Sequence, residues 1–595
     1  MGTFENNKSI AGSPVRPLRL WPGIVAIVLL ILARFALKAL VPGFEGFMWA
    51  IQGSLLCAAA IILWWLFFSR APWPDRAGAL VFIAAALGSS WLLKHESMGP
   101  AWLFAYAVPL VLVTFVAAAF AGRNLPNFSR RVVIAAAVLL SSLGWTLVRT
   151  DGIDGDHRAA FAWRWSATSE EKLLATPHPV PATLPAPALT EGVGPRVEDR
   201  RAAEHKPVAP AVADPEWLGF RGLNRDGIVP GVSVATDWLK TPPVEIWRKP
   251  IGPGWSSFAV QNGLIYTQEQ RGGEELVTAY SAANGDLVWR HADPVRFFES
   301  NAGAGPRATP TLADGRVYTL GATGILNVLD AATGQRIWTA DATSVTKQSV
   351  PDWGFSASPV VTHGLVIVYA GRLAAYEAAT GQLKWLGESV GGSYSSPHLA
   401  TIGGIEQLLI LTPEGAAGLD PATGATLWRH EWKGLPIIQP SLIPGGGILI
   451  SASQTQGTRR INLVPNHDGW RVDTGWTSLA LKPYFNDTVI HKGHAYGFDA
   501  RILTCIGLED GKRLWKGGRY GNGQMLLLPD QDLLFILSED GELALVEASP
   551  SGFTELARMP ALEGKTWNHP VIASGVLFVR NAGEMAAFRL PLAPR

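Results

Sequence analysis

The stretch VLDAATGQRIW, residues 328–338, carries the pattern that decides the fold of most of this chain. An apolar, strand-like run is followed by a Thr-Gly pair and then by a tryptophan. The same outline returns in AYSAANGDLVW (279–289), AYEAATGQLKW (375–385), GLDPATGATLW (418–428) and CIGLEDGKRLW (505–515). Such glycine pairs between β-rich runs predict hairpin turns, because glycine adopts the positive φ that a tight turn needs. We therefore expect a repeated all-β unit.

The tryptophan that ends each unit measures the period of the repeat. Successive copies lie about 40–50 residues apart, which with four strands per unit is typical of a β-propeller. An aromatic residue at one position of every unit predicts a structural role, namely docking between neighbouring blades. The tryptophans expected to dock the blades are Trp247, Trp289, Trp338, Trp385, Trp428, Trp476 and Trp515.

The two ends of the repeat predict how the ring closes. Residues 542–559 keep the strand–turn–strand outline without the tryptophan, and residues 568–590 supply only three strands. The segment VEIWRKPIG (244–252) precedes the first complete unit and can provide the missing fourth strand. Counted in this way there are eight blades, and closure by strands from both ends leaves no free sheet edge.

The first 150 residues have a different character and predict a membrane anchor. Arg34 and Lys38 interrupt the first of its apolar runs and would have to reach the nearer interface, so four spans is the alternative to five. The other runs contain essentially no ionisable residue, which favours an anchor over an ion or proton path. Five runs approach the roughly 20 residues that span a bilayer: about 20–42, 47–69, 77–93, 101–122 and 132–148.

The loop charges predict the orientation of this anchor. The basic residues expected to share one side are Lys8, Arg16, Arg19, Arg70, Arg76, Arg123, Arg130 and Arg131. Apart from the two residues at the end of the first span, only Lys94 and Arg149 fall on the other side. By the positive-inside rule the N-terminus is then cytoplasmic. We expect a bacterial inner-membrane protein with a periplasmic domain.

Composition separates the remaining parts and excludes some partners. Residues 151–216 contain TPHPVPATLPAPAL, which is typical of an extended Pro/Ala linker, and the propeller pattern then runs over residues 217–595. The formal net charge is +1, without a basic stripe, which argues against a nucleic-acid partner. Cys57 and Cys505 lie in different regions and predict no disulfide framework.

The A-x-D-x-x-T-G-x-x-x-W pattern resembles the tryptophan-docking repeat of pyrroloquinoline-quinone (PQQ) propellers. That superfamily includes quinoprotein dehydrogenases, and also non-catalytic members such as the lipoprotein of the outer-membrane β-barrel assembly machinery. The motifs GWSS (254–257), WGFSASP (353–359), SYSSP (393–397) and GRYGNGQ (518–524) are similar to a narrower group, the bacterial PQQ-binding-like repeat proteins. The resemblance covers residues 217–595 and implies the eight-bladed fold without naming a reaction.

A candidate site follows from the propeller geometry, because the loops that lead into the innermost strands gather at one mouth of the central channel. Their aromatic, amide and guanidinium side chains suit a flat, anionic, oxygen-rich ligand such as a quinone carboxylate. The alternative is that these residues only shape strand starts and fill the channel. The candidate ligand-binding residues are Trp255, Arg307, Trp353, Tyr394, Asn486, Asn522, Gln524, Trp567 and Asn568.

A quinoprotein dehydrogenase also needs Ca²⁺ ligands and a general base. Glu299, Asp352, Glu388 and Asp487 lie near the same loops, but none matches the metal or base positions of those enzymes, and we expect all four to be solvated. The adjacent Cys-Cys pair and the long insertions of the alcohol dehydrogenases are missing. No catalytic or metal-binding residue is therefore assigned, and PQQ with Ca²⁺ is a candidate cofactor only.

Two functions remain in competition, and the residues favour the first. The first is a binding or assembly scaffold that holds a protein partner on the propeller face or a small quinone-like ligand in the channel. The second is a membrane-bound, PQQ-dependent alcohol or sugar dehydrogenase that feeds the quinone pool. Several membrane spans followed by an eight-bladed propeller is the layout of membrane-bound glucose dehydrogenase. A sensor ranks last, because the N-terminal tail is too short for an output domain.

Overall fold

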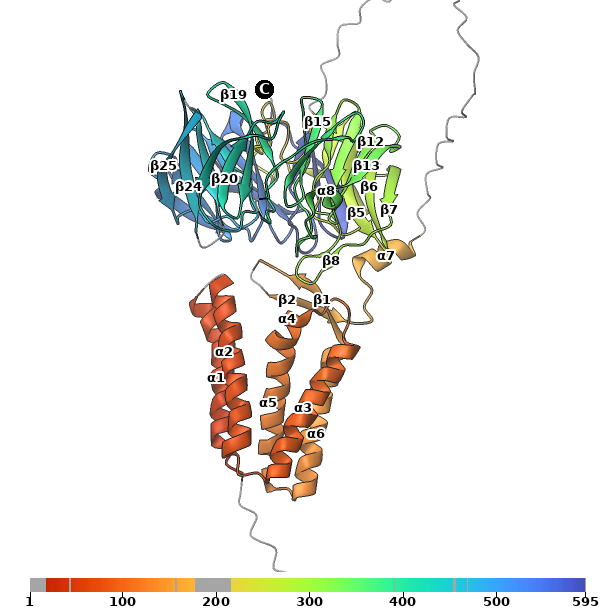
Figure 1. The fold of residues 1–595 in the computed structure, drawn as a ribbon, viewed down its shortest axis with the longest axis vertical. Coiled ribbons are helices and arrows are strands. Elements are labelled where there is room, and N and C mark those ends of the chain that lie inside the picture. Colours follow the sequence, from red (N-terminus) through yellow and green to blue (C-terminus); the bar gives the residue numbers. More distant parts are fainter. Residues whose placement is uncertain are drawn as a thin grey trace, which may run out of the picture. The chain divides into compact units, whose positions relative to one another are not determined.

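The computed structural model describes residues 18–41, 44–155, 158–176, 216–389, 391–452, 456–467 and 469–593. The chain divides into two compact units (Figure 1). One comprises Met1–Ser166 with Ser300–Ala302, and the other comprises Ala167–Glu299 with Gly303–Arg595. The helical anchor and the propeller that the sequence predicts correspond to these two units.

The first unit is a bundle of apolar helices. Within the described residues, four segments are long and apolar enough to cross a membrane: Gly46–Phe68, Trp73–Leu93, Pro100–Asn124 and Asn127–Thr146. The helices are α1 (Trp21–Leu40), α2 (Phe44–Leu63), η1 (Trp64–Phe68), α3 (Trp73–Leu93), α4 (Pro100–Trp102), η2 (Leu103–Ala107), α5 (Val108–Ala121), η3 (Gly122–Asn124) and α6 (Asn127–Thr146).

The expectation of five spans is corrected to four by the first helix. The apolar part of α1 that the structure describes, Trp21–Leu37, is shorter than a span and contains Arg34. The Arg34 guanidinium lies 4.3 Å from the ring centroid of Tyr106 in η2. A cation over an aromatic face recovers part of its hydration energy. The side chain of Lys38 lies outside the described residues.

The predicted linker begins too early, because residues up to 176 form secondary structure. β1 (Val148–Ile153) pairs antiparallel with β2 (Ala159–Trp163). The helix α7 (Ser169–Ala175) begins with a capping box, in which Thr168 and Glu171 each accept the other's backbone N–H. The Pro/Ala stretch itself lies outside the described residues, so its extended conformation stays a prediction.

The second unit confirms the eight-bladed propeller. Each blade is a four-stranded antiparallel sheet, and the blades are numbered here in chain order. Blades 1 to 4 are β4 (Ala259–Gln261), β5 (Leu264–Arg271), β6 (Glu274–Ser281) and β7 (Leu287–Asp293); β10 (Thr311–Ala313), β11 (Arg316–Leu320), β12 (Ile325–Asp330) and β13 (Arg336–Asp341); β14 (Val360–Thr362), β15 (Leu365–Tyr369), β16 (Leu373–Glu377) and β17 (Leu383–Leu386); and β18 (His398–Ile402), β19 (Ile405–Thr412), β20 (Gly415–Leu419) and β21 (Thr426–Glu431).

Blades 5 to 8 complete the ring. They are β22 (Ser441–Ile443), β23 (Gly447–Ser451), β24 (Thr458–Asn466) and β25 (Gly469–Ser478); β26 (Val489–His491), β27 (His494–Asp499), β28 (Ile502–Gly507) and β29 (Arg513–Arg519); β30 (Gln524–Leu528), β31 (Leu533–Leu537), β32 (Glu542–Glu547) and β33 (Glu555–Pro560); and β34 (Val571–Ala573), β35 (Val576–Arg580) and β36 (Glu584–Arg589) with β3 (Val244–Pro250). Short elements in connecting loops are β8 (Phe298–Glu299), β9 (Gly303–Ala304), α8 (Ala342–Thr346) and η4 (Pro529–Gln531).

Ring closure follows the predicted scheme. The early strand β3 pairs with the late strand β36, with Val244 opposite Arg589 and Pro250 opposite Glu584. Because the shared blade takes strands from both ends of the domain, the ring cannot open without breaking a sheet. Inner strands such as β15 and β31 are buried along their whole length, which explains their continuous apolar runs.

The repeated tryptophans join each blade to the next one. Six of the indole Nε1 atoms donate hydrogen bonds of 2.7–3.3 Å to backbone carbonyls in the hairpin turn of the following blade. Trp289, for example, donates to the carbonyl of Ala331. Trp428 differs, because its Nε1 donates to Gln407 in its own blade. The next blade has longer strands at this place, β24 and β25, which are joined directly after the Asn466–Gly469 pair and lack the Ala-Thr-Gly turn.

The turn glycine is needed for the same contact. Gly334 has φ of +71°, and a Cβ there would lie 2.4 Å from the Trp289 ring. Comparable clashes arise between Gly285 and Trp247 and between Gly381 and Trp338. The glycine thus serves the backbone turn and also leaves room for the indole of the preceding blade.

Gly334→Ala is expected to destabilise the propeller by roughly 1–3 kcal/mol more than Gly315→Ala. The methyl group added at position 334 would collide with the packed ring of Trp289, whereas the one added at position 315 would collide with nothing. Gly315 is the matched control, since its φ is +70° and nothing lies within 4 Å of a Cβ. Chemical unfolding of the two variants measures the difference. Equal losses would show that the positive φ alone accounts for the glycine.

Candidate functional site

The predicted site residues lie at one end of the central channel, the inlet end, where loops lead into the innermost strands of the blades. Every innermost strand is the first strand of its blade, so all of them run away from this end. Residues 255, 307, 353, 394, 486, 522 and 567–568 precede these strands, and Gln524 begins β30. The topology therefore gathers the predicted residues, although they are distant in sequence.

Six aromatic rings at the inlet end form a continuous row, which we call the aromatic row. All six are partly exposed. Tyr484 and Phe485 were not predicted, although the motif PYFND (483–487) occupies the corresponding loop. Centroid distances along the row are Tyr394–Trp353 4.9 Å, Trp353–Tyr484 6.3 Å, Tyr484–Phe485 5.2 Å, Phe485–Trp567 4.9 Å and Trp567–Trp255 4.8 Å.

Arg307, the predicted anion partner, is already held by the protein. Its guanidinium donates to the carbonyls of Trp353 (3.2 Å), Ala304 (3.1 Å), Gly303 (2.9 Å) and Gly305. Burial lowers the pKa of Arg307 to about 10, against the opposing effect of nearby carboxylates. These contacts give Arg307 a structural role in shaping the inlet loops.

The predicted amides connect neighbouring blades. Gln524 Nε2 donates to the carbonyls of Phe485 (3.4 Å) and Trp567 (3.1 Å), and Asn568 Nδ2 donates to those of Gly254 and Ser256. Several buried polar atoms of the same set have no protein partner: Asn486 Nδ2, Asn522 Nδ2 and Oδ1, Gln524 Oε1 and Asn568 Oδ1. Buried polar atoms are normally bonded, so these atoms are available to water or to a ligand in the channel.

The described carboxylates near the inlet end do not form a cluster that could hold a Ca²⁺ ion. No group of three or more His, Cys, Asp or Glu side chains within the described residues is arranged to hold a metal. Asp352 and Glu388 are exposed. Glu299 is instead paired with Arg307 at 3.4 Å, and its side chain is only 12% exposed. The expectation that Glu299 is solvated is therefore wrong, because the inlet loops enclose it.

Residues 217–229 form a plug inside the channel, which the sequence did not indicate. Trp217 pairs with Val260 of β4, the carbonyl of Leu218 accepts from Leu312 of β10, and Val229 donates to Leu527 of β30. The plug thus crosses between innermost strands of three blades. The only sequence signal was the pair of arginines in RGLNRDG, within a segment too short and glycine-rich for a strand.

Arg221 of the plug lies at the centre of a buried cluster of charged residues. Its Nε lies 3.6 Å from the Asp487 carboxylate, and its side chain is 1% exposed. Asp487 also accepts from the backbone N–H of Gln439 at 2.7 Å and lies 3.5 Å from His569 Nε2. Burial opposes ionisation, but Arg221 and His569 outweigh it and hold the pKa of Asp487 below its usual range. Asp487 is therefore neither solvated, as expected, nor free to act as a base.

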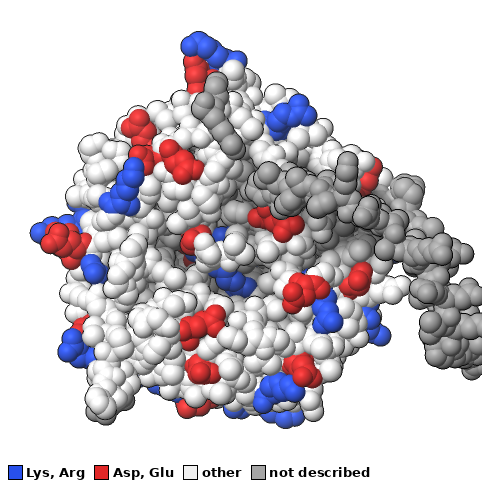
Figure 2. Space-filling view, turned by 90° about the horizontal axis from the view of Figure 1, so that it is seen from above, with Lys and Arg blue, Asp and Glu red and all other residues white. Residues whose placement is uncertain are grey.

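A cavity of about 760 Å³ opens at the other end of the channel, which we call the outlet cavity. It is lined by the plug, by β10, β14, β18, β22 and β26, and by the turn that follows β22. β36 ends beside the turn between β34 and β35, so this is the end marked C in Figure 1. Figure 2 looks onto that face and shows a hollow near its middle, with basic side chains inside it.

Asp487→Asn is expected to lower the free energy of unfolding of the propeller by about 3 kcal/mol at pH 7, because it leaves Arg221 buried without its counter-charge. A carboxyl with a lowered folded-state pKa stabilises above its unfolded pKa of about 3.9 and loses this effect in more acidic solution. The difference from the native chain should therefore shrink below about pH 4. Chemical unfolding across pH measures it.

Glu388→Gln is the control for that prediction. Glu388 pairs with Arg429 at the surface, where its side chain is 70% exposed, and an exposed pair contributes less than about 1 kcal/mol. A loss for Asp487→Asn no larger than this control would contradict a buried charge cluster.

Sequence comparisons agree with the fold. A family profile described as outer membrane protein assembly factor BamB matches residues 244–392. The quinohemoprotein alcohol dehydrogenase ADH-IIG of Pseudomonas putida is 29% identical over 180 residues, 28% of this chain and 24% of its own length. ADH IIB of the same species is 32% identical over 149 residues, 23% and 20% of the two chains. The chain thus spans about a quarter or less of these relatives.

Solved structures are similar at low sequence identity. BamB from Moraxella catarrhalis is 14% identical, with 58% of this chain and 100% of that chain covered and a TM-score of 0.44. The quinohemoprotein alcohol dehydrogenase from Comamonas testosteroni is 14% identical, with 64% and 81% covered and a TM-score of 0.45. The strand order of this chain shows that its carboxy-terminal unit is an eight-bladed propeller, and residues 244–392 of that unit are similar to the BamB family profile.

Proposed function

We propose that this chain is a membrane-anchored binding protein that holds a protein partner on the inlet face of its propeller. The observation that carries the proposal is the aromatic row, whose six partly exposed rings are in consecutive contact. Tryptophan and tyrosine dominate the hot spots of protein interfaces, because they bury a large area at a low cost in conformational entropy. Contiguous exposed rings are rarely kept on a surface without a partner.

Charge at the row supports the same proposal. Lys565 Nζ lies 4.4 Å from the ring centroid of Trp567 and 5.3 Å from that of Trp255. A cation above two indoles offers a partner both apolar area and a positive charge. An acidic or aromatic segment of the partner suits this combination.

A PQQ-dependent dehydrogenase is the second candidate function. The similarity to two quinohemoprotein alcohol dehydrogenases of Pseudomonas putida favours it. Against it, Arg307 is bonded to backbone carbonyls, and the described residues include no Ca²⁺ ligand set at the inlet. PQQ would supply the oxidising group if bound, but these residues leave no evident base or metal to serve it.

Location in the bacterial inner membrane, with the propeller in the periplasm, completes the proposal. Arg70 and Arg76 lie between α2 and the first turn of α3, and Arg123, Arg130 and Arg131 lie between α5 and the second turn of α6. These two basic connections share one side whether or not α1 crosses. The positive-inside rule makes that side cytoplasmic and puts the chain after α6 on the other side.

A photo-crosslinking residue in place of Lys565, in native membranes, is expected to give one specific protein adduct. The same probe in place of Lys512 is the control, since that side chain is 81% exposed on an outer turn. Trp353→Ala should reduce the Lys565 adduct at least tenfold, because it removes the ring that joins Tyr394 to Tyr484. Trp432→Ala, a half-buried tryptophan outside the row, should leave it unchanged.

Titration of the purified full chain with PQQ, with and without Ca²⁺, separates the two functions. Tight, Ca²⁺-dependent binding with dye-linked oxidation of an alcohol or sugar would replace the scaffold with the dehydrogenase. An adduct at Lys565 that Trp353→Ala leaves intact would remove the aromatic row from the proposal.

A further inference from the structure

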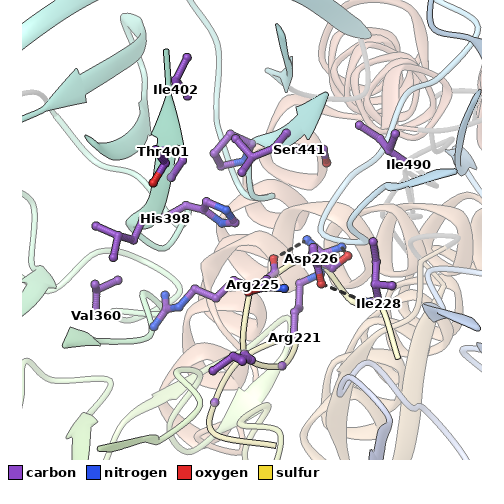
Figure 3. Close-up of a pocket in the computed structure, with 18 of the residues that line it drawn as sticks. Arg221, Arg225, Asp226, Ile228, Val360, His398, Thr401, Ile402, Ser441 and Ile490 are labelled. Atoms are coloured by element: carbon purple, nitrogen blue, oxygen red, sulfur yellow. Dashed lines mark hydrogen bonds between the residues drawn. The ribbon is translucent and has the colours of Figure 1, made fainter. Parts of the chain in front are cut away.

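We propose that the outlet cavity is a binding site for a small organic carboxylate with an apolar body, held between Arg225 and His398 (Figure 3). The site lies at the opposite end of the channel from the aromatic row and does not depend on the function proposed for that row. It uses side chains of the plug and of β18, which the inlet face does not use.

Arg225 brings a positive charge without a protein counter-ion. Its guanidinium donates to the carbonyls of Ser358 (3.2 Å), Pro397 (2.9 Å) and Pro359, and to Thr311 Oγ1 (3.4 Å). Within the described chain no carboxylate lies at ion-pair distance from it. Carbonyl oxygens orient a guanidinium but do not neutralise it, so an anion in the cavity would be stabilised. The four bonds also use four of its five N–H groups, leaving Nε–H as a donor.

His398 supplies the second polar group. Its residue is 2% exposed, it lines the cavity, and neither ring nitrogen has a hydrogen-bond partner. Arg225 donates to the carbonyl of Pro397, the residue that precedes His398, so the guanidinium lies near this histidine. A neutral imidazole has one N–H that can donate to a carboxylate oxygen. A buried imidazole without partners is costly, and a ligand that bonds to it removes that cost.

The charges around His398 agree with an anionic ligand. Burial first, and then Arg225 and Arg221, lower the pKa of His398 to about 3, while Asp487 acts in the opposite direction. The imidazole is therefore neutral near pH 7. The positive charge beside it comes from Arg225, because Arg221 is paired with Asp487. An anion is the ligand that this charge favours.

The rest of the lining defines the body of the ligand. Leu312, Val360, Leu399 and Ile490 line the cavity, so the group that follows the carboxylate should be apolar. A volume of about 760 Å³ accommodates a small molecule rather than a folded partner. Asp226 also lines the cavity, with its carboxylate accepting from Ile228 N–H at 3.0 Å. A second negative charge on the ligand would face it, so a monoanion is preferred.

Hexanoate and its neutral counterpart hexanamide test the proposal on the full chain in lipid nanodiscs, by ligand-detected NMR titration. We expect hexanoate to bind with a dissociation constant on the order of 1 mM, as suits so small a ligand, and hexanamide at least tenfold more weakly. His398→Ala should weaken hexanoate binding about tenfold, through loss of one charge-assisted hydrogen bond. His430→Ala is the control, because His430 lies on the outer strand β21.

Leu399→Trp keeps the test decisive if the histidine variant is unstable. The larger side chain fills the cavity without touching a polar group and should abolish binding, and circular dichroism checks that each variant is folded. Equal binding of hexanoate and hexanamide, or unchanged binding in both folded variants, would overturn the proposal. No saturable binding would show that the cavity holds water only and would also overturn it. None of these outcomes affects the crosslink at Lys565.

Discussion

The contact between an indole and the turn glycine of the next blade is the interaction on which the propeller depends. Trp289 illustrates it, with Nε1 bonded to the carbonyl of Ala331 and its ring against Gly334. Each blade is a sheet that would expose its faces if it stood alone. The indole buries area between two such faces and fixes their distance, since a single methyl group on the glycine would collide with it. Repetition of this contact, with closure through β3, converts eight weak sheets into one ring.

The plug fills the channel inside that ring and bonds to polar groups that line it. Eight innermost strands leave a space along the axis, into which carbonyls and polar side chains point. Arg221 and Arg225 bring guanidinium donors to several of these carbonyls, and Asp487 neutralises Arg221. Because Arg225 has no such counter-ion among the described residues, the plug also brings an unpaired guanidinium to the outlet end of the channel. The same segment therefore holds the blades together and gives the outlet cavity its charge.

The two ends of the channel thus differ in chemistry although they share the same strands. The inlet end presents aromatic rings that contact one another, with its arginine and amides committed to loop carbonyls. The outlet end presents a cavity with a guanidinium and an imidazole that, in the described part of the chain, have no counter-ion and no hydrogen-bond partner respectively. A surface of contiguous rings suits a macromolecular partner, whereas a cavity with polar groups on one side suits a small ligand.

Sequence by itself determined the repeat, the blade count, the closing strand and the inlet position of the nine candidate residues, because glycine turns, strand periodicity and recurring tryptophans are local signals. It overestimated the membrane spans at α1, whose described apolar part, Trp21–Leu37, is shorter than a span. Only the tertiary structure decided that Arg307 donates its hydrogen bonds to backbone carbonyls, that Asp487 is buried, and that residues 217–229 enter the channel. Each of these depends on which distant atoms surround a side chain. No local pattern encodes that neighbourhood, since charge, burial and hydrogen bonding become defined only when the ring has closed.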